Sequence, residues 1–369
     1  MSNVINVSMD SNKSRSLRKL LNTCNSEATK ENYLQRMNMF NRHIGQELDE
    51  FVTFDNKKIE ETIEDFIMDI KNKYSPNSIP TMLYPVKSFL EMNDILINWK
   101  KLYRFYPEKV KVSGQSAWST QDVQKIVSLS RKISSTAIIH MLASSGCRVG
   151  GLVGLKIRDV TNKEHGCKML NVYAGDKEEY KTFLTPEASI AYEDHIKYRM
   201  DKGDNISSDS YVFENKHGGQ MYTKQIYMIV KLIALHANVR GVIVTGGNTK
   251  GGRYGTQLLH GFRKRFNTIL KLNNEVNDNS IEKMMGHKNG LDGTYLQIPD
   301  DKLFENFMKG AIDLTVSDEH RLRLEKVELE KEKHELVNVL KARLEKLEKG
   351  RNVIVRKFVD IPKEDLQDV

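Results

Sequence analysis

Cysteine is scarce in this sequence. The three cysteines, Cys24, Cys147 and Cys167, form no CxxC pair, which excludes a thiolate-rich zinc site and a disulfide framework and is typical of a reducing compartment. Long apolar runs are also missing. Stretches such as TAIIHMLA at 136–143 are far shorter than a membrane span. The first residues lack the apolar core of a signal peptide. We therefore expect a cytoplasmic protein without a membrane segment.

The charge balance favours an anionic partner. Lys and Arg number 57 against 49 Asp and Glu, which gives a net charge of +8 and a pI near 9.1. Nucleic acid is the commonest partner of such a chain, although a merely basic globular protein has the same balance. The length of 369 residues exceeds one ordinary small domain, so two domains plus extra segments are expected.

The hydrophobic pattern predicts a mainly α fold with a small β-hairpin or sheet, of the α+β class. The predicted segments are a disordered N-terminus (1–14), an all-α domain (15–98), a basic linker (99–118), a mixed α/β domain (119–316), a long helix or coiled coil (317–350) and a C-terminal tail (351–369).

Helical spacing is clearest in the N-terminal domain. Tyr33, Met37 and Phe40 fall on one helix face, with Thr29 as a candidate N-cap. A further helix is expected over 57–73. The basic linker that follows could run along a phosphate backbone or could be an ordinary solvated connection.

Two features stand out in the remainder of the chain. MLNVYA and EYKTFLT alternate around the turn Gly175–Asp176, which predicts a β-hairpin. Beyond Asp318 the chain is rich in Glu, Lys and Leu, and its leucines form one stripe of a long helix. That helix could self-associate as a coiled coil or dock on its own protein. The stripe consists of Leu322, Leu329, Leu336, Leu340, Leu344 and Leu347.

Five polar residues between positions 148 and 295 form a candidate site. Arg148 lies in an apolar helix in SSGCRVGGLVGL, His260 and Arg263 form an H-x-x-R pair in LLHGFRKRF, His287 follows MMG, and Tyr295 lies eight positions later. Arginines can clamp phosphate oxygens, histidines can move protons near neutrality, and a tyrosine can attack phosphorus. Each residue has a plainer explanation, such as a salt bridge from Arg148 to Asp159 or a packed aromatic for Tyr295.

In this order and spacing, the motifs resemble the tyrosine recombinases, the family of phage integrases and of Cre-like and Xer-like enzymes. The resemblance covers about 120–300, and more loosely 20–93, which would be a SAM-like core-binding domain. GDKEEYKTFLTPEA, the GLDGTY spacing and the leucine-striped tail are most similar to archaeal integrases. Gly150 and Gly151 stand where the family often has Glu.

The resemblance implies specific roles for these residues. Arg148 and Arg263 would clamp the scissile phosphate, His260 and His287 would assist, and Tyr295 would be the nucleophile. A hairpin lysine would be the general acid. Lys177 is the first candidate and Lys181 the second.

The implied function is site-specific cutting and rejoining of double-stranded DNA by a homotetramer, without metal, cofactor or ATP, to integrate or excise a mobile element. Alternatives are a Xer-like resolvase of chromosome dimers, a relaxing type IB topoisomerase, or an inactive DNA-binding protein of the same fold.

Overall fold

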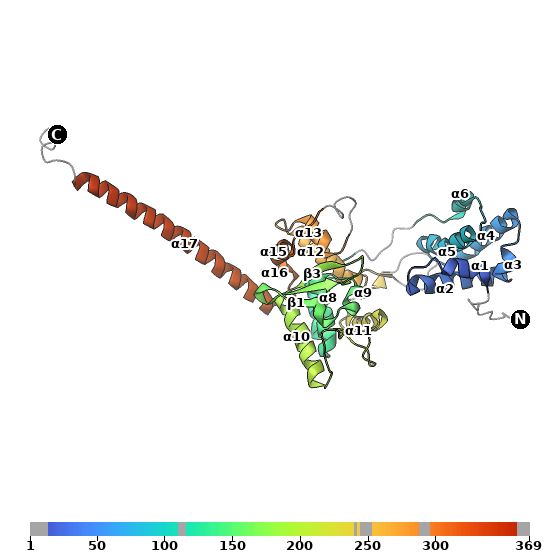
Figure 1. The fold of residues 1–369 in the computed structure, drawn as a ribbon, viewed down its shortest axis with the longest axis horizontal. Helices are drawn as coiled ribbons and strands as arrows, with labels where there is room; N and C mark the ends of the chain where they lie inside the picture. The colour runs from blue at the N-terminus through green and yellow to red at the C-terminus, as the bar shows by residue number, and fades with distance from the viewer. Residues whose placement is uncertain (1–13, 110–115, 240–241, 244–252, 288–295, 360–369) are drawn as a thin grey trace. The chain divides into compact units, whose positions relative to one another are not determined.

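The computed structural model describes residues 14–109, 116–239, 242–243, 253–287 and 296–359 (Figure 1). The chain divides into two compact units. The first comprises Met1–Ser113 and Val242–Tyr254, and the second comprises Gly114–Gly241 and Gly255–Val369. No helix among the described residues is both long and apolar enough to cross a membrane.

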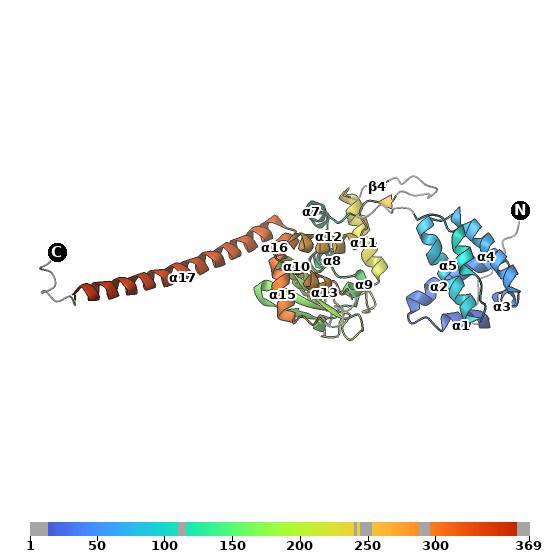
Figure 2. The ribbon, with the colours of Figure 1, turned by 90° about the horizontal axis from the view of Figure 1, so that it is seen from above.

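The first unit is a helical bundle (Figure 2) around a mainly apolar core, in which Ser16 and Asn41 are also buried. Phe40 contacts Phe51 and Phe66 edge to face at centroid distances of 5.4 and 5.1 Å. Its helices are α1 Arg15–Leu21, α2 Glu27–Ile44, α3 Leu48–Phe51, α4 Asn56–Lys71, the 3-10 helix η1 Pro76–Ser78 and α5 Ile79–Met92. The short strands β4 Val242–Ile243 and β5 Arg253–Tyr254 pair antiparallel.

Helix α2 begins earlier than its sequence pattern suggests. Ser26, rather than Thr29, is the N-cap, and its hydroxyl accepts the backbone N–H of Thr29. Both are residues that cap helices well, so the pattern alone does not choose between them. The expected second helix over 57–73 is α4, which is capped by Asp55.

The predicted linker begins too early. Helix α6 (Trp99–Leu102) and the 3-10 helix η2 (Tyr103–Phe105) occupy its first part, and Leu102 is fully buried in the core of the bundle. Lys101 pairs with Glu60 at 3.5 Å and also with Glu64. The apolar residues between the lysines therefore pack on the bundle, and one of the basic charges is neutralised there.

The second unit has a three-stranded antiparallel sheet, β1 Val160–Asn162, β2 Lys168–Val172 and β3 Tyr180–Leu184, in the order β1-β2-β3 (Figure 1). The predicted hairpin is β2 and β3, with Asn171 opposite Lys181. Its helices are α7 Thr120–Ser128, α8 Ile133–Ser145, α9 Val149–Gly154, α10 Pro186–Asp201, α11 Thr223–His236, α12 His260–Leu272, α13 Asp278–Met284, α15 Asp300–Lys309, α16 Ala311–Leu314 and α17 Asp318–Val359, with 3-10 helices η3 Ile157–Asp159 and η4 Glu164–Gly166.

Helix α8 is the centre of this unit, because ten of its residues are buried. It packs against α10, α12 and α7. Its C-cap is Gly146, whose φ of +58° is the left-handed conformation that glycine adopts without strain. Arg148 follows as the N-cap residue of α9, with φ −67° and ψ 143°. Arg148 therefore lies between two helices rather than within one.

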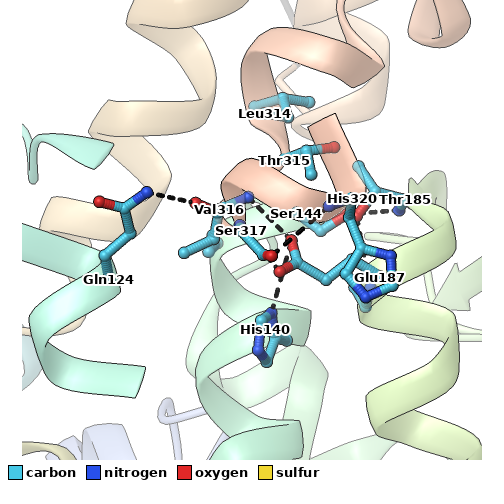
Figure 3. A network of polar contacts seen from close by, with 12 residues as sticks. Gln124, His140, Ser144, Thr185, Glu187, Leu314, Thr315, Val316, Ser317 and His320 are labelled. Carbon is cyan, nitrogen blue, oxygen red and sulfur yellow. Dashed lines mark hydrogen bonds and ion pairs between the residues drawn. The ribbon is translucent and has the colours of Figure 1, made fainter. Parts of the chain in front are cut away.

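The segment after α16 is anchored by a buried carboxylate (Figure 3). Glu187, near the start of α10, accepts the backbone N–H groups of Val316 at 2.8 Å and Ser317 at 2.9 Å. His140 Nδ1 lies 3.9 Å from the same carboxylate, and Gln124 donates to the Val316 carbonyl at 2.8 Å. This network fixes the start of α17 on α7, α8 and α10.

Helix α17 shows the predicted leucine stripe. Its six leucines are between 51% and 66% exposed, so the described part of the chain does not cover them.

Candidate functional site

Four of the predicted site residues meet in one place, although they come from three distant segments. Burial is the main cause that lowers the pKa of His260, and the charges of Lys264, Arg263, Arg148 and His287 lower it further. These groups therefore lie within electrostatic range of one another. The site is strongly cationic and suits an anion.

Arg263 is buried, with 4% of its surface exposed, and its guanidinium is held by backbone carbonyls. Nη1 donates to Gly146 O at 2.9 Å, and Nη2 donates to Met285 O at 2.5 Å. Burial lowers the pKa of Arg263, and the neighbouring Arg148 charge lowers it further. The two carbonyls fix the plane of the guanidinium, so the remaining N–H groups point in set directions.

His260 and Arg263 lie on the same face of α12, because they are three residues apart in the first turn of that helix. The next arginine, Arg265, is also buried, but its guanidinium donates to Ala143 O and Leu314 O at 3.3 and 3.1 Å. It thereby connects α12 with α8 and α16. The sequence HGFRKR therefore holds one arginine for the site and another for the core.

Tyr180, at the start of β3, connects the two arginines of the site. Its hydroxyl accepts the backbone N–H of Arg148 at 3.4 Å and is also hydrogen-bonded to the side chain of Arg263. Burial raises the pKa of Tyr180 above the usual range, so its phenol stays neutral. Tyr180 is not among the residues predicted from the sequence, because one tyrosine in a strand gives no signal of its own.

Two glycines allow the close packing around this site. Gly146 and Gly286 both have positive φ, and a Cβ atom on either would overlap an aromatic ring. The nearest atoms would be Phe266 Cγ at 2.5 Å and Tyr180 Cδ1 at 2.4 Å. Glycine is therefore required here both for backbone conformation and for space.

His287 is held from both sides. Its Nε2 lies 2.8 Å from Arg263 Nη2, and its Nδ1 lies 2.5 Å from the Glu282 carboxylate on α13. Lys271 of α12 in turn donates to Glu282 at 2.6 Å. Glu282 is a second residue of the site that was not predicted from the sequence. The only signal in the sequence is a carboxylate five positions before a candidate histidine. This spacing becomes informative only once the structure shows that α13 ends between Glu282 and His287.

The two lysine candidates occupy different places. Lys177 is exposed in the turn between β2 and β3. Lys181 lies within β3 and pairs with Asp300 at the start of α15. Because side chains alternate along a strand, Lys181 and Phe183 face α15, whereas Tyr180 and Thr182 face the end of α8. Lys181 is therefore directed away from the arginines.

Asp159 does not pair with Arg148. Its carboxylate instead accepts the backbone N–H of Lys156 at 2.9 Å. The salt bridge considered as a plainer explanation for Arg148 is not found among the described contacts. Tyr295, the predicted nucleophile, lies outside the described residues.

Residues 118–292 match the model of the phage integrase family. This part of the chain is therefore similar to a phage integrase domain. No curated protein matches the chain.

Several solved recombinase structures share the fold. The XerH site-specific recombinase bound to its difH substrate has 14% identity and a TM-score of 0.50, over 79% of this chain and 87% of that one. A dimer of a lambda integrase fragment bound to a COC′ core site has 15% identity and a TM-score of 0.50, over 77% and 96%. The Tn1549 transposon integrase in complex with transposon right end DNA also has 15% identity and a TM-score of 0.50, over 79% of this chain and 96% of that one. At such identities the likeness concerns the fold alone.

Proposed function

We propose that this chain cleaves and rejoins double-stranded DNA through a covalent 3′-phosphotyrosyl intermediate, and that it serves to integrate or excise a mobile element. The observation that supports this proposal most is the convergence of Arg148, His260, Arg263 and His287 in one cationic site within a phage integrase domain. Such a site binds one phosphodiester and places hydrogen-bond donors around it.

The arginines would stabilise the transition state. Arg263 is fixed by the carbonyls of Gly146 and Met285 before any substrate arrives, so its remaining donors need little reorganisation. Arg263 Nη2 also donates to the imidazole of His287, and a phosphate oxygen can take the place of that acceptor. Arg148 is held at its backbone by Tyr180 and supplies the second cation.

In the proposed cleavage step, the Tyr295 oxygen attacks phosphorus and the bond to the 5′-oxygen breaks. The tyrosine proton goes to a base, and the leaving oxygen receives a proton from an acid. One phosphoester replaces another, so the later attack of a 5′-hydroxyl restores the DNA without ATP. His260 has a lowered pKa and is neutral near pH 7, so it can accept a proton. Lys177 is our candidate for the acid.

A covalent-trapping assay tests the nucleophile. Nicked duplexes with a randomised central segment lose the fragment that carries the 5′-hydroxyl once cleaved, so an adduct accumulates and is seen on an SDS gel. We expect the wild type to form an adduct in the presence of EDTA and Tyr295→Phe to form none. Sequencing of the trapped DNA would also reveal the preferred site.

Tyr180→Phe is the matched control, because Tyr180 is the other tyrosine that contacts the arginines. Its buried, neutral phenol is a poor nucleophile, so this variant should still form the adduct, at a reduced rate. An adduct formed by Tyr295→Phe would overturn the proposed mechanism, and so would the loss of the wild-type adduct in EDTA.

A bridging 5′-phosphorothiolate tests the lysine. Its sulfur leaves without a proton, so a variant that lacks the general acid should cleave it at the wild-type rate while cleaving normal DNA slowly. We expect Lys177→Ala to show this rescue. Rescue of Lys181→Ala instead would move the role to Lys181, despite its pairing with Asp300.

We further propose that the active assembly is a homotetramer on DNA in the cytoplasm. Similar structures include XerH bound to its difH substrate and a lambda integrase dimer bound to a core site, which supports DNA as the partner and assembly on it. The subfamily prediction, archaeal integrases, is supported by the GDKEEYKTFLTPEA segment, the GLDGTY spacing and the leucine-striped tail alone.

Two other activities fit the same chemistry. A Xer-like resolvase would recombine two copies of one site, and a type IB topoisomerase would relax supercoiled plasmid without sequence preference. The sequence of the trapped DNA and a plasmid-relaxation assay separate these from an integrase. An inactive DNA-binding protein would bind duplex DNA and form no adduct.

A further inference from the structure

The imidazole of His287 is held in one tautomer. Arg263 has no hydrogen-bond acceptor, so its Nη2 must donate to His287 Nε2, 2.8 Å away. Nε2 is then unprotonated, and the ring proton of neutral His287 lies on Nδ1. Nδ1 in turn donates to Glu282 Oε2 at 2.5 Å. The two neighbours thus specify both the tautomer and the plane of the ring.

The carboxylate that receives this proton is itself fixed. Lys271 Nζ donates to Glu282 Oε1 at 2.6 Å, so each oxygen of the carboxylate has its own partner. Burial raises the pKa of Glu282, but the hydrogen bonds from Lys271 and His287 outweigh it and lower the pKa to about 2. Glu282 therefore remains an anion at any pH at which the enzyme would work.

We propose that Glu282 is a positioning residue for catalysis, which keeps His287 protonated on Nδ1 so that Nε2 is the atom presented to the scissile phosphate. Lys271 orients the carboxylate for this purpose. This inference depends on the proposed function, since His287 is given a role in DNA cleavage there.

The arrangement has a consequence once phosphate binds. If Arg263 turns its Nη2 donor to a phosphate oxygen, Nε2 of His287 is released and can take up a proton. The imidazolium would then donate to the phosphate from Nε2 and to Glu282 from Nδ1.

Loss of the carboxylate would allow the wrong tautomer. A ring protonated on Nε2 would direct that proton at the Nη2 donor of Arg263, and two donors repel each other. Either the imidazole or the guanidinium would have to move. Such a shift would lower the rate of cleavage with little effect on DNA binding, because the phosphate-clamping arginines keep their charges.

Single-turnover cleavage of the trapped duplex tests the proposal. We expect Glu282→Gln to slow cleavage roughly ten- to hundredfold, the usual effect of removing a partner that orients a functional histidine. DNA affinity should stay near the wild-type value.

Asp278→Asn is the matched control. It removes one carboxylate from the first turn of the same helix, and we expect its cleavage rate and DNA affinity to match the wild type. A double-variant cycle separates positioning from general stability. In a His287→Ala background, Glu282→Gln should have no further effect on the rate.

Nitrogen NMR of the histidine rings gives a readout that needs no activity. Free wild-type protein should show the Nδ1–H tautomer at His287, and Glu282→Gln should lose that preference. An Nε2–H tautomer in the wild type, or full cleavage by Glu282→Gln, would overturn the proposal. If the wild type itself formed no adduct, the proposed function would fail instead, while the tautomer measurement would still decide the structural part.

Discussion

The hydroxyl of Tyr180 accepts a hydrogen bond from the backbone N–H of Arg148 at 3.4 Å and is also hydrogen-bonded to the side chain of Arg263. One strand residue thereby connects the short segment between α8 and α9 to helix α12. The two arginines of the site come from segments more than a hundred positions apart in the chain, so a contact of this kind is needed to set their separation.

Removal of this hydroxyl should weaken the site without destroying it. Tyr180→Phe leaves the N–H of Arg148 without its acceptor, which costs about 1 kcal/mol in the free energy of unfolding. Adduct formation should slow by roughly tenfold, the rate equivalent of about 1.4 kcal/mol. Single-turnover kinetics and urea denaturation measure the two effects. An unchanged rate would show that Tyr180 does not align the arginines.

Gly286 lies directly before His287, and its substitution should disturb the same region more strongly. Gly286→Ala places a Cβ atom 2.4 Å from Tyr180 Cδ1 at a φ of +63°. Gly218→Ala is the control, since its φ of +76° brings the same backbone strain with no atom within 4 Å. The control should lose about 1–2 kcal/mol of stability and keep its activity. Gly286→Ala should lose more stability and most of its cleavage activity.

Sequence reasoning succeeded where local chemistry is sufficient. The alternation around Gly175–Asp176 predicts β2 and β3, and the leucine spacing predicts α17. The helical position of Arg148 was predicted wrongly, because Gly146 ends α8 two residues earlier by a left-handed turn that the apolar pattern does not reveal. Tyr180 and Glu282 could not be found, since their importance comes from neighbours that are distant in sequence or visible only in three dimensions.

Glu187 provides a test of how the C-terminal segment is attached (Figure 3). Glu187→Ala would leave the N–H groups of Val316 and Ser317 without acceptors, at a cost of about 1–3 kcal/mol for each buried group. We expect amide hydrogen exchange at these two residues to accelerate at least tenfold. Gln124→Ala is the milder comparison, because it removes only a donor to the Val316 carbonyl. Unchanged exchange in Glu187→Ala would show that other contacts hold the segment.

The leucine stripe of α17 predicts self-association of the full-length chain. Leu322, Leu329 and Leu336 are seven residues apart and at least 60% exposed, as expected for one seam of a coiled coil. Leu329→Glu with Leu336→Glu should lower the mass measured by light scattering in the absence of DNA. Glu335→Gln, on the exposed surface of the same helix, should not change it. A wild-type monomer at all concentrations would show instead that the stripe does not pair copies of this chain.

The buried His195 should make the stability of the second unit depend on pH. Its Nε2 lies 3.0 Å from Val212 O and so carries the ring proton, while Nδ1 is buried without a hydrogen-bond partner among the described residues. Burial lowers the pKa of His195 in the folded protein, and Arg199 also lowers it. The unfolded chain therefore binds more protons than the folded chain below about pH 6.5, the ordinary histidine pKa.

Stability should accordingly fall as the pH drops from 7.5 to 5, by up to about 2 kcal/mol from this histidine. His195→Gln keeps a donor for Val212 O and removes the titratable group. The free energy of unfolding of this variant should therefore fall less over the same pH range. Fluorescence of Trp118, buried in this unit, reports its unfolding in a Trp99→Phe background. His140, whose pKa burial also lowers, should leave a residual pH dependence in His195→Gln. Equal losses in both proteins would mean that His195 is protonated in the folded state as readily as in the unfolded chain.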